Sequence, residues 1–106
     1  MPKYLYVGSY TAEAVKGVLK EGGSSRRDAV RQLIESGGGQ LEAFYFALGD
    51  NDFYIVADFP DSVSSLSCTL LVNASGTVRT KTVALLTPED VDEATKKSAD
   101  YRPPGG

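Results

Sequence analysis

Histidine and tryptophan are missing from this chain of 106 residues, and cysteine and methionine occur once each. Without histidine there can be no His-ligated haem, no His-containing zinc site and no Ser-His or Cys-His nucleophile pair. A metal would depend on scattered carboxylates and Cys68, and a catalytic base would have to be Asp, Glu, Lys or Tyr. The sequence therefore predicts no metal, no haem and no other cofactor.

Long apolar runs and clusters of cations are also missing. The apolar runs are much shorter than the roughly 20 residues that span a bilayer, so we expect no membrane contact. The net charge is −3, and lysine and arginine are adjacent only in pairs such as Arg26-Arg27, which argues against nucleic-acid binding. No leader pattern precedes Lys3, and the single cysteine suits a reducing compartment, so a cytoplasmic location is expected.

The hydrophobic patterns that are present predict alternating strands and helices within one domain, residues 1–106, with a tail from about 98. We expect strands over 3–10, 40–48, 52–59 and 77–87, and helices over 11–22, 25–36, 61–76 and 88–97. This βαββαβ order with a C-terminal helix is the ferredoxin-like α+β plan. It places a four-stranded antiparallel sheet with helices on one face only.

Local signals support several of these boundaries. The turn Gly49-Asp50-Asn51-Asp52 predicts a hairpin, and Ser25-x-x-Asp28 is typical of a helix capping box. Helical spacing places one apolar stripe on the helix over 61–76, and we expect this stripe to face the core. The stripe consists of Val63, Leu66, Leu70 and Ala74.

Strand alternation sorts the side chains of the sheet onto two faces. The dominantly apolar set, which should meet the helices, is Leu5, Val7, Phe44, Phe46, Phe53, Ile55, Ala57, Phe59, Val78 and Ala84. The mixed set, which should face away from them, is Tyr4, Tyr6, Tyr10, Ala43, Tyr45, Asp52, Tyr54, Val56, Asp58, Arg79, Lys81 and Val83. A small monomer seldom leaves such an aromatic patch in water, so we expect at least a homodimer that pairs this face.

Several short motifs resemble those of the GYD domain family, small bacterial and archaeal proteins of the dimeric α/β barrel superfamily. The matching segments are Gly8-Ser9-Tyr10-Thr11, Gly22-Gly23-Ser24-Ser25-Arg26-Arg27, Gly38-Gly39, Glu42-Ala43-Phe44-Tyr45, Gly49-x-x-Asp52 and Asp58-x-Pro60-Asp61. The resemblance implies a ferredoxin-like domain that pairs into a dimeric α/β barrel. Asn51 stands where the family's Gly-x-Tyr-Asp motif has tyrosine, so a role of that tyrosine does not transfer.

The tyrosines of the mixed face are candidates for a ligand site, because each offers an apolar ring and a polar tip. We expect a planar apolar ligand to contact Tyr4, Tyr6, Tyr45 and Tyr54, with Asp58 and Arg79 as polar contacts. The alternative is that the same rings fill a dimer interface, where aromatic residues are generally enriched.

A second candidate is an anion site at the start of the helix that follows Gly22-Gly23. Ser24, Ser25, Arg26 and Arg27 combine backbone N–H groups, hydroxyls and positive charge. The alternative is a helix cap with two solvated cations. Cys68, on the flank of its helix, is expected to be a structural thiol.

Three classes of function remain compatible with these residues. The first is a small-molecule-binding or regulatory protein without catalysis, which the lack of histidine favours. The second is a cofactor-independent enzyme, oxygenase-like or isomerase-like, that uses Tyr and Asp in a barrel cavity. The third is a structural assembly unit, which a barrel filled by side chains would favour.

Overall fold

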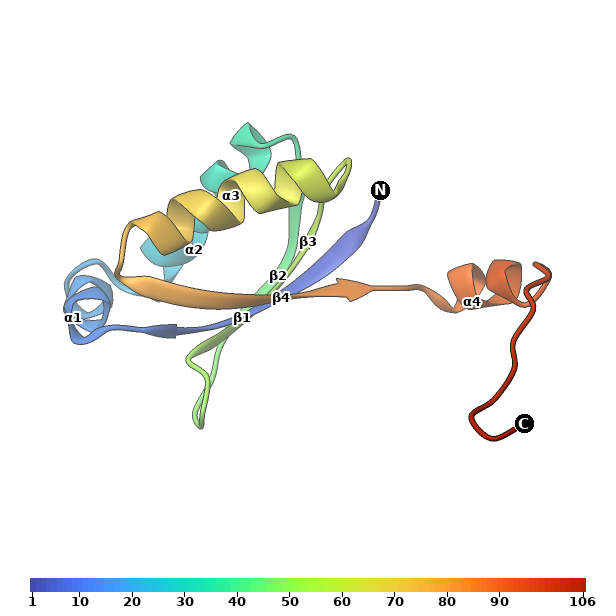
Figure 1. Cartoon of the computed structure of the whole chain (residues 1–106). Helices are drawn as coiled ribbons and strands as arrows, with labels where there is room; N and C mark the ends of the chain where they lie inside the picture. Colours follow the sequence, from blue (N-terminus) through green and yellow to red (C-terminus); the bar gives the residue numbers. More distant parts are fainter.

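The predicted order of strands and helices is confirmed by the computed structural model, which describes residues 1–106 (Figure 1). The elements are β1 (Lys3–Tyr10), α1 (Ala12–Glu21), α2 (Gly23–Ser36), β2 (Gln40–Phe46), β3 (Phe53–Asp58), α3 (Ser62–Ala74), β4 (Val78–Leu85) and α4 (Pro88–Ala94). The chain therefore has the α+β composition that its hydrophobic patterns indicate.

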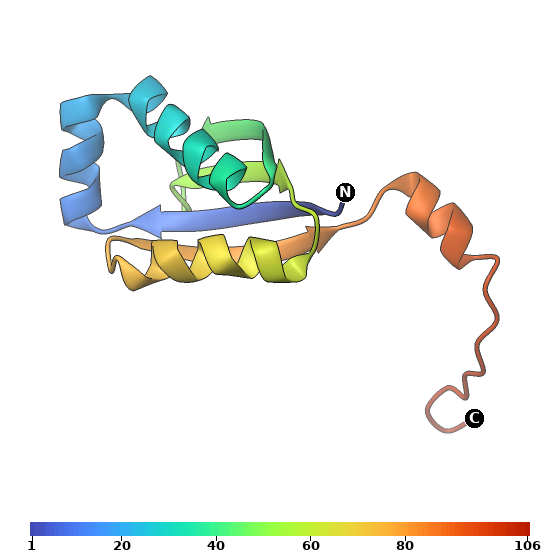
Figure 2. The same ribbon diagram turned by 90° about the horizontal axis from the view of Figure 1, so that it is seen from above.

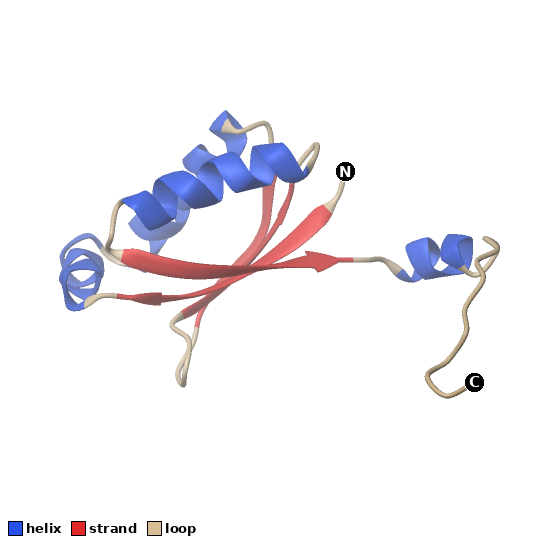
Figure 3. Ribbon diagram, viewed as in Figure 1, coloured by secondary structure: helices blue, strands red, loops and turns tan.

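All four strands join one antiparallel sheet in the order β2-β3-β1-β4. Helices α2 and α3 lie on one face of this sheet, and the face below it carries no helix (Figures 2 and 3). We call the face without helices the open face. Because β1 and β3 are the central strands, their side chains determine what lies under the helices.

The expected orientation of β1 is wrong. Tyr4 and Tyr6 are buried on the helix side, where they pair with Ala57 and Ile55 of β3. Leu5 and Val7 consequently lie on the open face. Each face of β1 carries large side chains with apolar surface, so the alternation of residues alone does not predict which face meets the helices. The larger tyrosine rings bury more apolar area, and α3 supplies partners for their hydroxyl groups.

The expected orientation of α3 is wrong in the complementary way. Its predicted stripe is exposed, with Val63, Leu66 and Leu70 all more than half accessible. The opposite side of the helix meets the sheet and buries Ser65 and Cys68. One set of contacts links the two reversals, because the buried hydroxyls of Tyr4 and Tyr6 need hydrogen-bond partners and Ser62 and Ser65 of α3 provide them.

Helices α1 and α2 follow each other without a loop. Gly22, at φ +85°, ends α1 and directly precedes α2, so Ser25 lies inside α2 rather than at its cap. A positive φ of this kind favours glycine. Helix α1 buries none of its side chains and stands at one end of the sheet, beyond the start of α2 (Figure 2).

Helix α4 and the C-terminal tail project beyond the end of β4, away from the sheet and the other helices (Figure 1). The radius of gyration is 17.0 Å, whereas a compact domain of this length has about 13 Å. Within α4, Thr87 and Asp90 form a reciprocal capping box and Pro88 occupies the first turn. The helix is thus held by local interactions.

Candidate functional site

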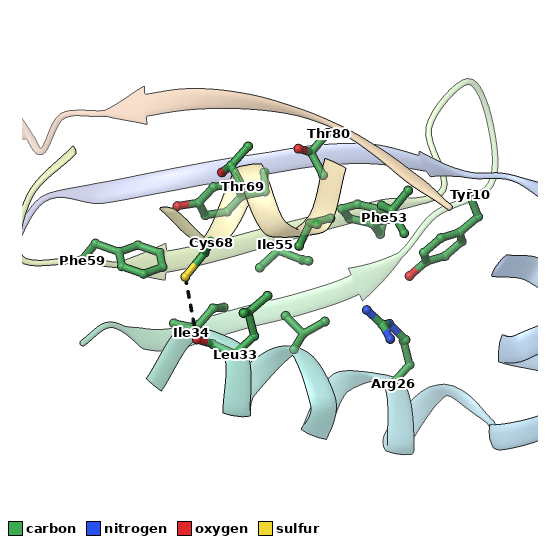
Figure 4. A pocket seen from close by; sticks show the side chains of 14 residues that line it. Tyr10, Arg26, Leu33, Ile34, Phe53, Ile55, Phe59, Cys68, Thr69 and Thr80 are labelled. Atoms are coloured by element: carbon green, nitrogen blue, oxygen red, sulfur yellow. Dashed lines mark hydrogen bonds between the residues drawn. The ribbon is translucent and has the colours of Figure 1, made fainter. Parts of the chain in front are cut away.

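A hollow lies between the helix-facing side of the sheet and helices α2 and α3 (Figure 4). We call it the inner hollow; its free space is about 60 Å³, and 11 of its 14 lining residues are hydrophobic. The lining residues are Tyr6, Tyr10, Arg26, Val30, Leu33, Ile34, Phe53, Ile55, Phe59, Cys68, Thr69, Val72, Val78 and Thr80. Every layer that encloses the core therefore contributes to its wall.

The buried polar side chains in the middle of this wall are hydrogen-bonded within the protein. The Tyr6 hydroxyl is hydrogen-bonded to Oγ of Ser65, and the Cys68 thiol donates to the carbonyl oxygen of Leu33 over 3.7 Å. Burial raises the pKa of the Tyr6 hydroxyl and of the Cys68 thiol above their ordinary values. Both groups are therefore protonated at neutral pH.

The hydrogen bond between Tyr6 and Ser65 is expected to contribute measurably to stability. Tyr6→Phe leaves the buried Ser65 hydroxyl without its partner, which should cost about 1–3 kcal/mol in urea unfolding. The control is Tyr101→Phe on an exposed ring of the C-terminal tail, which should change stability by less than about 0.5 kcal/mol. Equal losses in the two variants would contradict the role assigned to the bond.

One end of the inner hollow is polar. The Tyr10 hydroxyl and the Arg26 guanidinium point toward each other there (Figure 4). Burial raises the pKa of the Tyr10 hydroxyl, with the nearby Arg26 charge acting in the opposite direction. These two residues also line a wider groove of about 480 Å³ toward α1, which we call the outer groove. The inner hollow and the outer groove thus meet at Tyr10 and Arg26.

The sheet separates the tyrosines that the sequence placed together. Tyr4 and Tyr6 lie under the helices, with the Tyr4 hydroxyl 3.2 Å from Oγ of Ser62. Tyr45 and Tyr54 pair with each other on the open face. The expectation that all four rings share one face is wrong, since β1 has the opposite orientation. Tyr6 is the only one of the four that lines the inner hollow.

The two polar residues of that predicted set also lie on the open face. Asp58 accepts a hydrogen bond of 2.9 Å from Nζ of Lys3, which also pairs with Glu42. Arg79 is exposed on β4, opposite Ser9 of β1. Asp58 and Arg79 are thus far across the sheet from each other, with β1 between their strands.

The predicted anion set is also divided. Ser24 and Ser25 are exposed in the first turn of α2, and Arg27 forms an ion pair with Asp28. Arg26 alone is half-buried and reaches the inner hollow. Sequence reasoning did not place Tyr10 beside Arg26, because Tyr10 had been assigned to the opposite face of the sheet.

Several motif residues have clear structural roles. A Cβ on Gly8 would lie 2.3 Å from Cζ of Phe53 and 2.4 Å from the carbonyl oxygen of Arg79. The Asp52 carboxylate accepts a hydrogen bond of 2.8 Å from the backbone N–H of Tyr10, which ties the hairpin to β1. Asp61 caps α3 through the N–H of Ser64, and this bond lowers the pKa of the Asp61 carboxyl.

Two general features bear on the chemistry that the chain supports. No three side chains of Cys, Asp or Glu come together in a group able to hold a metal ion. None of the helices combines the length and the apolar character that a bilayer crossing needs.

A sheet of order β2-β3-β1-β4 with a lined hollow beneath two helices defines an α+β domain that encloses a small apolar space. The chain belongs to the GYD domain family, whose model matches residues 4–95. The resemblance inferred from the motifs is thus confirmed. Searches of curated proteins and of solved structures returned no significant match.

Proposed function

We propose that this protein binds a small organic molecule in the inner hollow without catalysing a reaction. The observation that carries the proposal is the hollow itself, whose wall is mainly hydrophobic and polar at one end. Ligand sites in proteins typically combine an apolar lining with a few polar groups that orient the ligand. A filled interior, as the assembly-unit alternative requires, would leave no such space.

The protonation state of the wall favours binding over catalysis. Tyr6, Tyr10 and Cys68 all have a pKa raised mainly by burial, so none of them is a base or a thiolate at neutral pH. Asp58, the carboxylate considered for an oxygenase-like or isomerase-like reaction, lies on the open face and pairs with Lys3. The inner hollow therefore offers donors and apolar contacts rather than a proton acceptor.

The binding proposal is tested with toluene as a neutral apolar probe. In a ¹H–¹⁵N NMR titration, we expect amide shifts confined to residues that line the inner hollow and the outer groove into which it opens. Val72→Phe should fill this space and abolish the shifts, whereas Leu70→Phe, on the exposed side of α3, should leave them intact. Shifts that persist in Val72→Phe, or no shifts in the wild-type protein, would contradict the proposal.

We also propose that the functional unit is a homodimer formed through the open face. A row of paired residues crosses this face, namely Tyr45, Tyr54, Val7 and Lys81. A twofold axis parallel to the strands places Lys81 of each copy over Tyr45 of the other, which provides a cation–π contact. Lys81 has no ion-pair partner within its own chain, so it is available for this contact.

Light scattering should detect a dimer at micromolar concentration. Val56→Glu places a charge on the half-buried centre of the open face and should produce monomers. Leu66→Glu, on the exposed side of α3, should leave the dimer intact. A monomeric wild-type protein, or dissociation by Leu66→Glu alone, would overturn the proposed interface.

A further inference from the structure

Arg26 is a cation without a carboxylate partner at the polar end of the inner hollow. The two arginines that follow it in α2, Arg27 and Arg31, both form ion pairs with Asp28 on the outside of the helix. Arg26 is half-buried and forms no ion pair. A guanidinium group that no carboxylate of its own chain engages is available to bind an anion through its fork of N–H donors. The groups that face Arg26 therefore determine what it can bind.

Tyr10 adds a hydroxyl donor beside this charge. Its ring lies between the sheet and α2, and its hydroxyl points toward the Arg26 guanidinium (Figure 4). Because burial raises the pKa of Tyr10, the hydroxyl keeps its proton at neutral pH. Three carboxylates lie near this end, and none forms an ion pair with Arg26: Glu13 and Glu21 line the outer groove, and Asp52 accepts a hydrogen bond from the backbone N–H of Tyr10. The position between Tyr10 and Arg26 thus presents a positive charge and an O–H donor.

Apolar side chains continue from this polar end into the protein. Val30, Phe53, Ile55 and Val72 line the inner hollow, whose free space of about 60 Å³ is smaller than a ring requires but continues into the outer groove of about 480 Å³. The outer groove gives access from solvent on the side of Tyr10 and Arg26. A ligand with a single ring fits across the two spaces, with its apolar part against Leu33 and Val72, which line both, and its polar end between Tyr10 and Arg26.

We propose that the ligand of the inner hollow is a small carboxylic acid with an apolar or aromatic body. Its carboxylate is bound by the fork of N–H donors on Arg26 and accepts a hydrogen bond from the Tyr10 hydroxyl. A guanidinium fork matches carboxylate and phosphate alike, but the mainly hydrophobic wall of the inner hollow favours an anion that carries an apolar body. This inference rests on the proposed binding function and specifies the ligand class.

The experiment compares benzoate with benzamide, a neutral molecule of nearly the same shape, by ¹H–¹⁵N NMR titration of the full chain at pH 7. We expect benzoate to bind at least about tenfold more tightly, because the charge-assisted hydrogen bonds to Arg26 form only with the anion. The side-chain Nε–H signal of Arg26 should shift with benzoate. Inorganic phosphate, titrated in parallel, has no apolar body and should bind more weakly than benzoate.

The matched variants are Arg26→Gln and Arg27→Gln, which change adjacent residues of α2. Arg26→Gln should remove the preference for benzoate, and Arg27→Gln should retain it. Arg26→Lys keeps the charge without the planar fork and should retain only part of the preference. Arg26→Lys also tests the role of Arg26 if the Arg26→Gln variant does not fold. Glu21→Gln should tighten benzoate binding, since it removes a negative charge from the outer groove.

The outcomes separate this inference from the binding function on which it rests. If toluene binds in the inner hollow but benzoate and benzamide bind equally, the carboxylate proposal fails and the binding function stands. If none of the three probes shifts the lining residues, both fail. Tighter binding of phosphate than of benzoate at Arg26 would also overturn the carboxylate proposal.

Discussion

Replacing Phe59 by alanine should destabilise the protein by about 3–5 kcal/mol, as expected when a fully buried aromatic ring is deleted. The side chain is 1% exposed. Its ring contacts those of Tyr4 and Tyr6 edge to face, each with a centroid distance of 6.3 Å. Because small domains are stable by only about 5–15 kcal/mol, this single change removes a large part of the total. Urea unfolding measures the loss.

The matched control is Phe46→Ala, which also removes a ring on the helix side of the sheet. Phe46 lies on the edge strand β2 and is 45% exposed, so its loss should cost less than about 2 kcal/mol. If Phe59→Ala does not fold, Phe59→Leu should retain enough packing to unfold reversibly at a lower urea midpoint. Comparable losses in Phe59→Ala and Phe46→Ala would refute the central role of Phe59.

Gly8→Ala is the second change with a large expected effect. The added methyl group would lie 2.4 Å from the Arg79 carbonyl oxygen, a backbone atom of the neighbouring strand that cannot move without breaking the pairing of β1 and β4. It would also overlap the Phe53 ring. Overpacking of this kind costs about 1–3 kcal/mol or more, and the urea midpoint should fall accordingly.

Gly17→Ala provides the control for this substitution. A Cβ on Gly17 meets no atom within 4 Å, and the residue lies inside helix α1. Alanine should therefore stabilise the protein by up to about 1 kcal/mol through its higher helix propensity. If Gly8→Ala and Gly17→Ala shift the midpoint in the same direction, the close approach described at Gly8 does not constrain the fold.

The sequence contains enough information for the element order and for three of the four strand orientations. The starts of α3 after Asp61 and of α4 at Pro88 were predicted from local chemistry, because the start of a helix depends on residues only a few positions apart. The orientations of β1 and α3 depend on each other. Tyr6 can be buried only if Ser65 turns inward, and a pattern read along one segment carries no information about that choice.

The candidate site was only partly predictable for a related reason. Arg26 was singled out by its charge near the start of a helix, but nothing local distinguishes it from Arg27. The difference arises from the position of α2 over the sheet, which directs one side chain toward Tyr10 and leaves the other beside Asp28. The inner hollow depends on the distances between α2, α3 and the sheet. These distances produce no periodic pattern in the sequence, so the sequence does not predict the hollow.

Helix α4 has a consequence for how the chain unfolds. It is seven residues long and draws on its own capping box rather than on contacts with the sheet. Isolated helices of this length are marginal in water, so α4 should form and melt on its own, without waiting for the sheet to open. The part of the chain that unfolds cooperatively should therefore extend only to about Leu85, the last residue of β4. Substitutions at Thr87 and Pro88 should therefore change the stability of α4 alone, whereas substitutions at Phe59 change the stability of the whole domain.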